Sequence, residues 1–155
     1  MRLRLILLGM AVLVTVLLFQ VYAAGPAITV YKDPGCGCCS IWVKHLEANG
    51  FEVTVHNVPD IAEYKEKYGV PDDARSCHTG VVGGYTIEGH VPAAEIHRLL
   101  KERPQAKGLA VPGMPIGSPG MESASMANQN YRVLLFKANG ETSVYSEYLG
   151  LERVK

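Results

Sequence analysis

The sequence predicts an α/β domain over residues 25–155, with a four-stranded mixed sheet flanked by helices. Two observations carry this prediction: short β-branched runs alternate with stretches of helical periodicity, and the turn Gly83-Gly84 joins two of the strands as a hairpin. Strands that alternate with helices build a sheet through right-handed crossovers. A chain of 155 residues can bury one such core, so we expect a single domain.

Residues 1–24, ahead of this domain, predict a secretory signal peptide. Arg2 and Arg4 precede an apolar run at residues 5–19, and Val21-Tyr22-Ala23 matches a small-x-small cleavage site. The run is about 15 residues long, whereas a membrane span takes about 20 residues. We therefore expect a cleaved signal and an exported protein, attached to a membrane only if this segment is kept as an anchor.

The first half of the domain is predicted as strand, helix and strand. Residues 27–31 (AITVY) form a β-branched run that ends in the turn Lys32-Asp33-Pro34-Gly35. Apolar residues at helical spacing over residues 40–48 predict a helix, which Asn49-Gly50 ends. Alternation in residues 51–55 (FEVTV) predicts a half-buried strand. The cysteines just before residue 40 therefore lie at a helix N-terminus.

The second half continues the alternation. Residues 61–68 are polar and helix-prone, residues 80–82 and 85–87 are two short strands, and Pro92 opens a further helix. The resulting order, β-α-β-α-β-β-α, is typical of thioredoxin and glutaredoxin domains. We therefore predict a thioredoxin-like fold.

Two further segments follow the last helix. Residues 108–123 contain three prolines and four glycines, a composition that suits neither a helix nor a strand interior, so we expect a long, shaped Pro/Gly/Met loop. Residues 131–136 and 142–148 flank Asn139-Gly140, a strong hairpin signal. We expect this C-terminal β-hairpin to extend or cap the sheet.

The charge balance excludes one class of function. Without Arg2 and Arg4 the chain carries 13 basic and 15 acidic residues, and it has no basic stripe. Nucleic-acid binding depends on clustered lysines and arginines that meet the phosphates. Nucleic acid is therefore not an expected partner.

Four cysteines in an exported chain ordinarily indicate two structural disulfides. Within the cluster Cys36-Gly37-Cys38-Cys39, only Cys36 and Cys39 can bridge without a strained short ring. One of the three could instead pair with Cys77. Two disulfides would require that bridge together with a second one inside the cluster.

The cluster also suits a metal. A helix N-terminus lowers the pKa of a thiol, and the thiolate is both a nucleophile and a metal ligand. A dithiol oxidoreductase needs one attacking and one resolving thiol, whereas Cys36, Cys38 and Cys39 provide three. Three thiolates within four residues favour a soft cation that accepts bridging sulfur, above all Cu(I), with Zn(II) as its competitor.

Other residues are weighed as ligands individually. Cys77, just before the third strand, is the expected fourth thiolate, and its alternative is a buried, inert thiol. His78 is either an imidazole ligand or a hydrogen-bond donor to one. Met114 and Met121 are candidate thioether ligands because they lie in the Pro/Gly loop, where packing demand is low.

The remaining polar candidates have no partner by spacing. We expect Lys44 and His45 on a solvated helix face, and we expect the other histidines to be ordinary surface residues. These are His56, His90 and His97.

The motifs together resemble the CopG-like copper-resistance proteins, a family also known as a metal-binding domain of unknown function. They are DPGCGCC (33–39) with Trp42, CHT (77–79), GLAVPGMP (108–115) and GSPGME (117–122). The resemblance covers nearly all of the chain after the signal. It implies a thioredoxin-like fold, a periplasmic location and an association with copper-resistance operons.

The resemblance also implies a multinuclear Cu(I) cluster bridged by cysteine sulfur, with a proposed redox role. Carried over to this sequence, the cluster thiolates are Cys36, Cys38, Cys39 and Cys77. The leading hypothesis is a periplasmic protein of copper resistance that holds Cu(I) and cycles it with Cu(II), as a copper-dependent oxidoreductase would. Its expected partners are copper ions and other periplasmic copper-resistance proteins. The alternatives are a metal-free periplasmic thiol-disulfide oxidoreductase and a disulfide-stabilised binding module.

Overall fold

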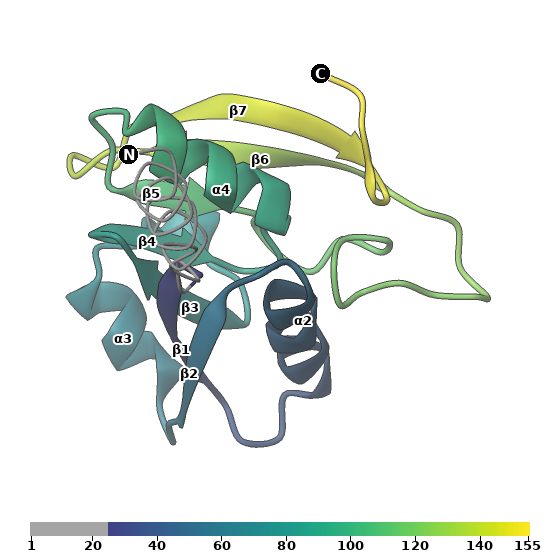
Figure 1. The fold of residues 1–155 in the computed structure, drawn as a ribbon, viewed down its shortest axis with the longest axis horizontal. Helices are drawn as coiled ribbons and strands as arrows, with labels where there is room; N and C mark the ends of the chain where they lie inside the picture. The colour runs from purple at the N-terminus through teal and green to yellow at the C-terminus, as the bar shows by residue number, and fades with distance from the viewer. Residues whose placement is uncertain (1–24) are drawn as a thin grey trace, which may run out of the picture.

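The computed structural model describes residues 25–155, so the signal peptide predicted at residues 1–24 lies outside the described part. These residues form a mixed α/β fold, in which three α-helices lie against one eight-stranded mixed sheet (Figure 1). None of the helices formed by residues 25–155 is long and apolar enough to cross a membrane. The predicted α/β class is confirmed.

The first four strands form the sheet that the sequence predicts. Strand β1 pairs in parallel with β2 on one side and antiparallel with β3 on the other, and β3 continues into β4 through Gly83-Gly84. The order in the sheet is β2-β1-β3-β4. The four strands are β1 (Ala27–Lys32), β2 (Glu52–Asn57), β3 (His78–Val82) and β4 (Tyr85–Glu88).

Four more strands continue the same sheet beyond β4, so the expected four-stranded sheet is too small. The predicted C-terminal hairpin extends the sheet as β6 and β7, and a short β8 follows. The link is β5, which pairs in parallel with β4 and antiparallel with β6. The four strands are β5 (Gly108–Ala110), β6 (Asn130–Phe136), β7 (Thr142–Leu149) and β8 (Glu152–Arg153).

Strand β5 corrects the prediction that residues 108–123 hold no strand. The absence of a side chain at Gly108 is what allows the strand to form, because a Cβ there would collide with the carbonyl of Thr86 on β4. Only the part after Ala110 is the predicted long loop.

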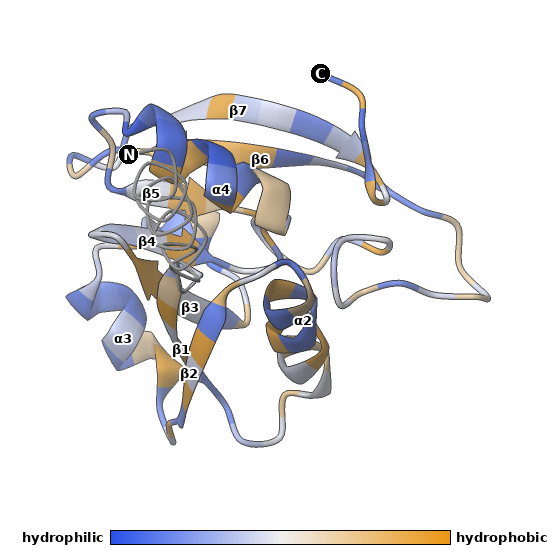
Figure 2. Cartoon of the chain, in the orientation of Figure 1, coloured by the Kyte–Doolittle hydropathy of each residue, from blue (hydrophilic) through white to orange (hydrophobic). Residues whose placement is uncertain are grey.

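The helices lie on opposite faces of the sheet. Successive strand residues point to opposite sides, and on β1 Ile28 and Val30 join the main core, which includes residues of α2 and α4. Tyr31 points the other way and stacks on Tyr64 and Tyr68 of α3. Figure 1 shows α3 and α2 on either side of the first strands, and Figure 2 shows apolar residues along those strands. The helices are α2 (Gly37–Ala48), α3 (Ile61–Lys67) and α4 (Ala93–Glu102), with a 3-10 turn at Asp72–Ala74.

Candidate metal centre

The N-terminus of α2 is built from a turn and a sulfur cap. The Asp33 carboxylate accepts a hydrogen bond from the Gly35 backbone N–H at 2.7 Å, and the Asp33 carbonyl accepts one from Cys36 at 3.1 Å. The Cys36 sulfur then accepts from the backbone N–H of Cys39 at 3.3 Å, which makes Cys36 the N-cap of the helix. The cysteines therefore lie at a helix N-terminus, as predicted.

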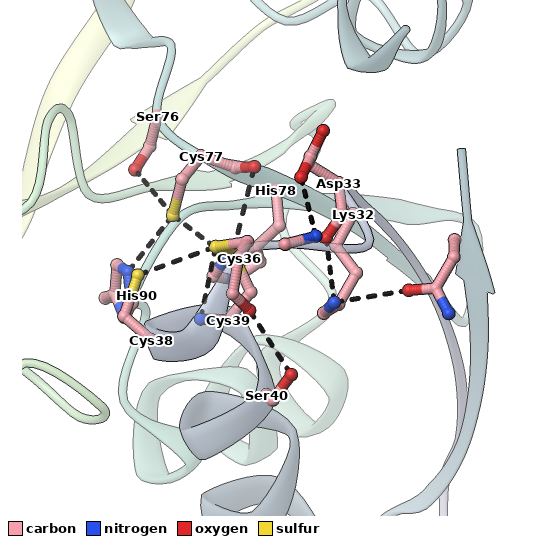
Figure 3. Close-up of a disulfide and its surroundings, with 12 residues drawn as sticks. Lys32, Asp33, Cys36, Cys38, Cys39, Ser40, Ser76, Cys77, His78 and His90 are labelled. Atoms are coloured by element: carbon pink, nitrogen blue, oxygen red, sulfur yellow. Dashed lines mark hydrogen bonds between the residues drawn. A yellow bond between two sulfur atoms is a disulfide. The ribbon is translucent and has the colours of Figure 1, made fainter. Parts of the chain in front are cut away.

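Cys36 and Cys39 form a disulfide, the one pairing within the cluster that the spacing allows, while Cys38 and Cys77 are free thiols (Figure 3). The Cα atoms of Cys36 and Cys39 are 5.4 Å apart, an ordinary separation for a disulfide. The Cys38 sulfur lies 3.5 Å from that of Cys36. The structure thus holds one disulfide rather than two.

Cys77 joins this cluster from the loop that precedes β3. The sulfur atoms of all four cysteines lie within 4.8 Å of one another. Cys39 is buried and the other three are half-buried. The fold therefore brings together the four cysteines that the sequence predicts as ligands. One of them, Cys77, is 38 residues from Cys39, its nearest neighbour among them in the sequence.

Burial raises the pKa of the Cys77 thiol to about 11, and the neighbouring Cys38 adds to the rise. The Ser76 hydroxyl, whose oxygen lies 3.8 Å from the Cys77 sulfur, acts in the opposite direction. Cys77 is therefore a neutral thiol near pH 7, and a metal that binds it must displace its proton.

His78 lies where the sequence places it, beside Cys77. Its Nδ1 is 3.2 Å from the Cys77 sulfur, and its ring lies over Trp42 with the ring centres 4.2 Å apart. The side chain is fully buried, and burial holds its pKa well below the ordinary value, so the imidazole is neutral. Its Nε2 has no hydrogen-bond partner among residues 25–155.

His90 contradicts the expectation of a surface residue. It is fully buried, and its Nε2 lies 3.1 Å from the Cys77 sulfur. Its Nδ1 is 2.8 Å from the carbonyl of Pro119, which can only accept, so Nδ1 carries the proton and Nε2 can accept the S–H of the neutral Cys77 thiol. Cys77, His78 and His90 thus form a second group of metal-ligand type that shares Cys77 with the first.

The hairpin register contains a signal for His90. The turn Gly83-Gly84 sets Val82 opposite Tyr85 and Thr79 opposite Glu88. Two further steps along the same register place residue 77 opposite residue 90. A two-residue hairpin at Gly83-Gly84, continued past the ends of its two strands, therefore predicts that His90 lies beside Cys77.

The Pro/Gly/Met loop covers the site at three points. The Ser76 hydroxyl donates to the carbonyl of Gly113, and the Pro119 carbonyl holds His90. At Gly120, a Cβ would come within 2.8 Å of the Cys38 carbonyl oxygen. The predicted ligands Met114, which is exposed, and Met121, which is half-buried, are carried on this loop.

The other lysine and histidine candidates from the sequence lie outside the cysteine cluster. Lys44, His56 and His97 are exposed, as expected. His45 is not simply solvated, because its Nε2 accepts a hydrogen bond from the backbone N–H of Ala93 at 3.1 Å and so joins α2 to the start of α4.

Comparisons with known proteins cover most of the chain. A family described as "Protein of unknown function, DUF411" matches residues 74–121, which span Cys77, His90 and the loop. Two solved structures, titled "Copper resistance protein copG" in Form 2 and Form 1, are 51% and 52% identical to the chain. Each alignment covers 80% of this chain and 98% of the other, with TM-scores of 0.76 and 0.75. No curated protein matches the chain.

Proposed function

Because the chain belongs to the family of the copper resistance protein CopG, we propose that it binds copper as Cu(I) in a thiolate cluster. The proposed ligands are Cys36, Cys38, Cys39 and Cys77, with more than one Cu(I) held in each chain. We propose that it does so in the periplasm, after export, and alongside other periplasmic copper-resistance proteins.

The observation that carries the proposal is the convergence of four sulfur atoms within 4.8 Å. A thiolate lies about 2.3 Å from a metal such as zinc, so two sulfurs on one ion are about 4.6 Å apart or less. The convergence of the four sulfurs therefore suits metal bridging once the Cys36–Cys39 disulfide is reduced and its two sulfurs move apart. Thiolates favour Cu(I), and zinc is the main competitor for the same ligands.

The disulfide sets a condition on this function. Cys36 and Cys39 are oxidised in the structure, and a disulfide sulfur does not replace a thiolate as a ligand. A thiol reductant that supplies two electrons and two protons converts the disulfide to two thiols, and these release their protons to solvent when the metal binds. The four-thiolate site therefore belongs to the reduced protein.

The histidines and methionines complete the proposed donor set. The Nε2 lone pair of His90 is oriented toward Cys77 and makes His90 a nitrogen donor to a metal held there. His78 either donates its Nδ1 proton to the Cys77 sulfur or binds the metal through the same atom. Met114 and Met121 stay predicted thioether ligands.

One observation favours a second candidate, a metal-free thiol-disulfide oxidoreductase. The disulfide lies at the N-terminus of a helix with Cys36 half-exposed, a position suited to exchange with another thiol. The strand order β2-β1-β3-β4 with helices on both faces supports our proposal that the fold is thioredoxin-like. The position of Cys38 argues against an oxidoreductase. A third thiol 3.5 Å from the Cys36 sulfur would compete with the incoming thiol in disulfide exchange.

A titration of the chain after residue 24 tests the proposal. Protein reduced and kept under anaerobic conditions is titrated with Cu(I) against a competing chelator, beside the oxidised protein that keeps the disulfide. We expect more than one Cu(I) in each reduced chain and fewer in the oxidised chain. Saturation at one ion contradicts the cluster, and a preference for zinc in the presence of Cu(I) contradicts the copper assignment.

A disulfide-reduction assay separates the two candidates. We expect the copper-free, reduced protein to reduce insulin disulfides much more slowly than a thioredoxin does, because Cys38 crowds the Cys36–Cys39 pair. Rapid turnover without copper would favour the oxidoreductase.

A further inference from the structure

A buried ion pair lies beneath the cysteine cluster. Lys65 of α3 and Glu88 at the end of β4 are 2.6 Å apart, and their side chains are 5% and 0% exposed. Burying two charges costs desolvation energy, and replacing such a pair with apolar residues is often neutral or stabilising. A buried ion pair is therefore weak evidence for a contribution to the stability of the fold.

The Glu88 carboxylate binds the chain on both sides of Cys77-His78. One oxygen accepts a hydrogen bond from the backbone N–H of Ser76 at 2.6 Å, in addition to Lys65. The other accepts from the Thr79 hydroxyl at 2.7 Å. The next residue, Gly89, donates its N–H to the carbonyl of His78 at 3.0 Å. The end of β4 thus fixes the chain before and after Cys77.

These contacts matter because Cys77 is the cysteine that does not come from the start of α2. Figure 1 shows α3 across the sheet from α2, so Glu88 and Lys65 act on Cys77 from the face opposite the other three cysteines. Cys77 itself precedes the first residue of β3 and has no ladder pairing of its own. Its distance from α2 therefore depends on the residues that hold its neighbours.

We infer that Glu88, with Lys65 as its counter-ion, is a positioning residue that holds Cys77 at the cluster and so sets the copper affinity of the site. This inference rests on the proposed function. Glu88 supplies the hydrogen bonds on both sides of Cys77, and Lys65 balances the charge of the buried carboxylate. Groups that hydrogen-bond a metal ligand directly change metal affinity by about tenfold to a hundredfold when they are lost, and Glu88 acts on the neighbours of the ligand, so we expect the lower end of that range.

Two double variants separate position from stability. Lys65→Met with Glu88→Leu removes both charges and the hydrogen bonds to Ser76 and Thr79. Lys65→Met with Glu88→Gln also removes both charges but keeps a neutral carbonyl that can accept from Ser76. We expect the leucine variant to bind Cu(I) about tenfold more weakly than the wild type, and the glutamine variant to recover most of this loss.

A second readout follows Cys77 without copper. In the reduced, metal-free protein, the rate at which a thiol reagent alkylates Cys77, measured by peptide mass spectrometry, should rise in the leucine variant and change little in the glutamine variant. Glu95→Gln is the control, because Glu95 is also a buried carboxylate, paired with Arg98 at 3.1 Å and with Tyr148 at 2.8 Å. It should alter the melting temperature and leave both readouts unchanged.

Equal copper affinity and equal alkylation in the leucine variant and the wild type would overturn the inference. If the leucine variant does not fold, Thr79→Val takes its place, since it removes one of the two hydrogen bonds that the carboxylate accepts from the residues flanking Cys77-His78. Wild-type behaviour of that variant would also overturn the inference. A wild-type chain that takes up no Cu(I) would instead refute the proposed function, and the alkylation rates would still test the position of Cys77.

Discussion

At the scale of single residues, Cys77 is the ligand that distinguishes the folded site from a short cysteine-rich peptide, because it is remote from the other three cysteines in the sequence. Cys36, Cys38 and Cys39 are close in sequence and can bind copper in an unfolded chain. Cys77 reaches them only because β3 pairs with β1. A ligand that binds the folded chain alone stabilises it by RT ln(1 + [L]/Kd), about 4 kcal/mol at a thousandfold excess over Kd.

The first prediction follows from this difference. We expect Cys77→Ser to lower the copper-induced rise in melting temperature, on the order of 10 °C in the wild type, by more than it lowers the melting temperature of the metal-free protein. Anaerobic melts of both reduced proteins with and without Cu(I) measure it. Equal copper-induced shifts would remove Cys77 from the site.

The second prediction concerns the buried histidines and pH. Burial lowers the pKa of His78 well below its ordinary value, and it also lowers the pKa of His90 and His45. An unfolded histidine takes up a proton near pH 6.5, whereas folded His78 does not. The unfolded chain then binds more protons, so the free energy of unfolding falls as pH drops below about 6.5.

Melts of the reduced, metal-free protein between pH 7 and pH 5 measure this effect, since most carboxylates titrate below that window. We expect the melting temperature to fall toward pH 5, and His78→Gln to reduce the slope. A slope that is the same in His78→Gln and in the wild type would show that His78 does not resist protonation.

At the scale of elements, the sequence was most informative where the pattern is local. The periodicity of α2 and the Gly83-Gly84 turn are properties of neighbouring residues, and both elements occur as predicted. Strand β5 has only three residues, and its partners β4 and β6 are remote in the chain, so local propensity could not show it. His90 was missed for a related reason: its partner lies across the hairpin rather than along the chain.

The third prediction tests how the loop fits α2. Gly120 has φ +87°, and a Cβ there would lie 2.8 Å from the Cys38 carbonyl oxygen and 2.9 Å from the Trp42 nitrogen. We expect Gly120→Ala to lower the free energy of unfolding by about 2–4 kcal/mol, from left-handed strain and from the collision. Urea unfolding of the reduced protein measures it.

Gly113→Ala is the matched control in the same loop. Its φ is +68°, and a Cβ there would meet no atom of residues 25–155 within 4 Å. It should therefore cost only the left-handed strain, about 1–2 kcal/mol. If Gly120→Ala and Gly113→Ala lowered the free energy of unfolding equally, the loop would not be in close contact with α2 at Gly120.

At the scale of the whole molecule, the sheet is one continuous structure rather than a small domain with an appended hairpin. The hairpin contributes Tyr131, Val133 and Tyr148 to the same core cluster as Ile28 and Ile87 of the first strands. The turn Asn139-Gly140 between residues 131–136 and 142–148 predicts a hairpin but not how deeply it is buried, because its burial depends on the pairing of β5 with β4.

The fourth prediction concerns the hairpin. A chain that ends at residue 129 should lose cooperative unfolding in urea and expose apolar surface to a hydrophobic dye, because it lacks those buried side chains. A chain that ends at residue 151 loses only the exposed β8 and the residues after it and should unfold cooperatively. Cooperative unfolding of the shorter chain would show that the first part folds by itself.

The position of Trp42 has a practical consequence. It is the only tryptophan of the protein, it lies one helical turn after Cys39, and it is fully buried with its indole N–H bonded to the Val91 carbonyl at 2.9 Å. Its ring is 4.2 Å from that of His78. The chain thus carries an intrinsic fluorophore beside the cluster. Its emission can report metal binding, disulfide reduction and unfolding in a single sample, without an attached dye.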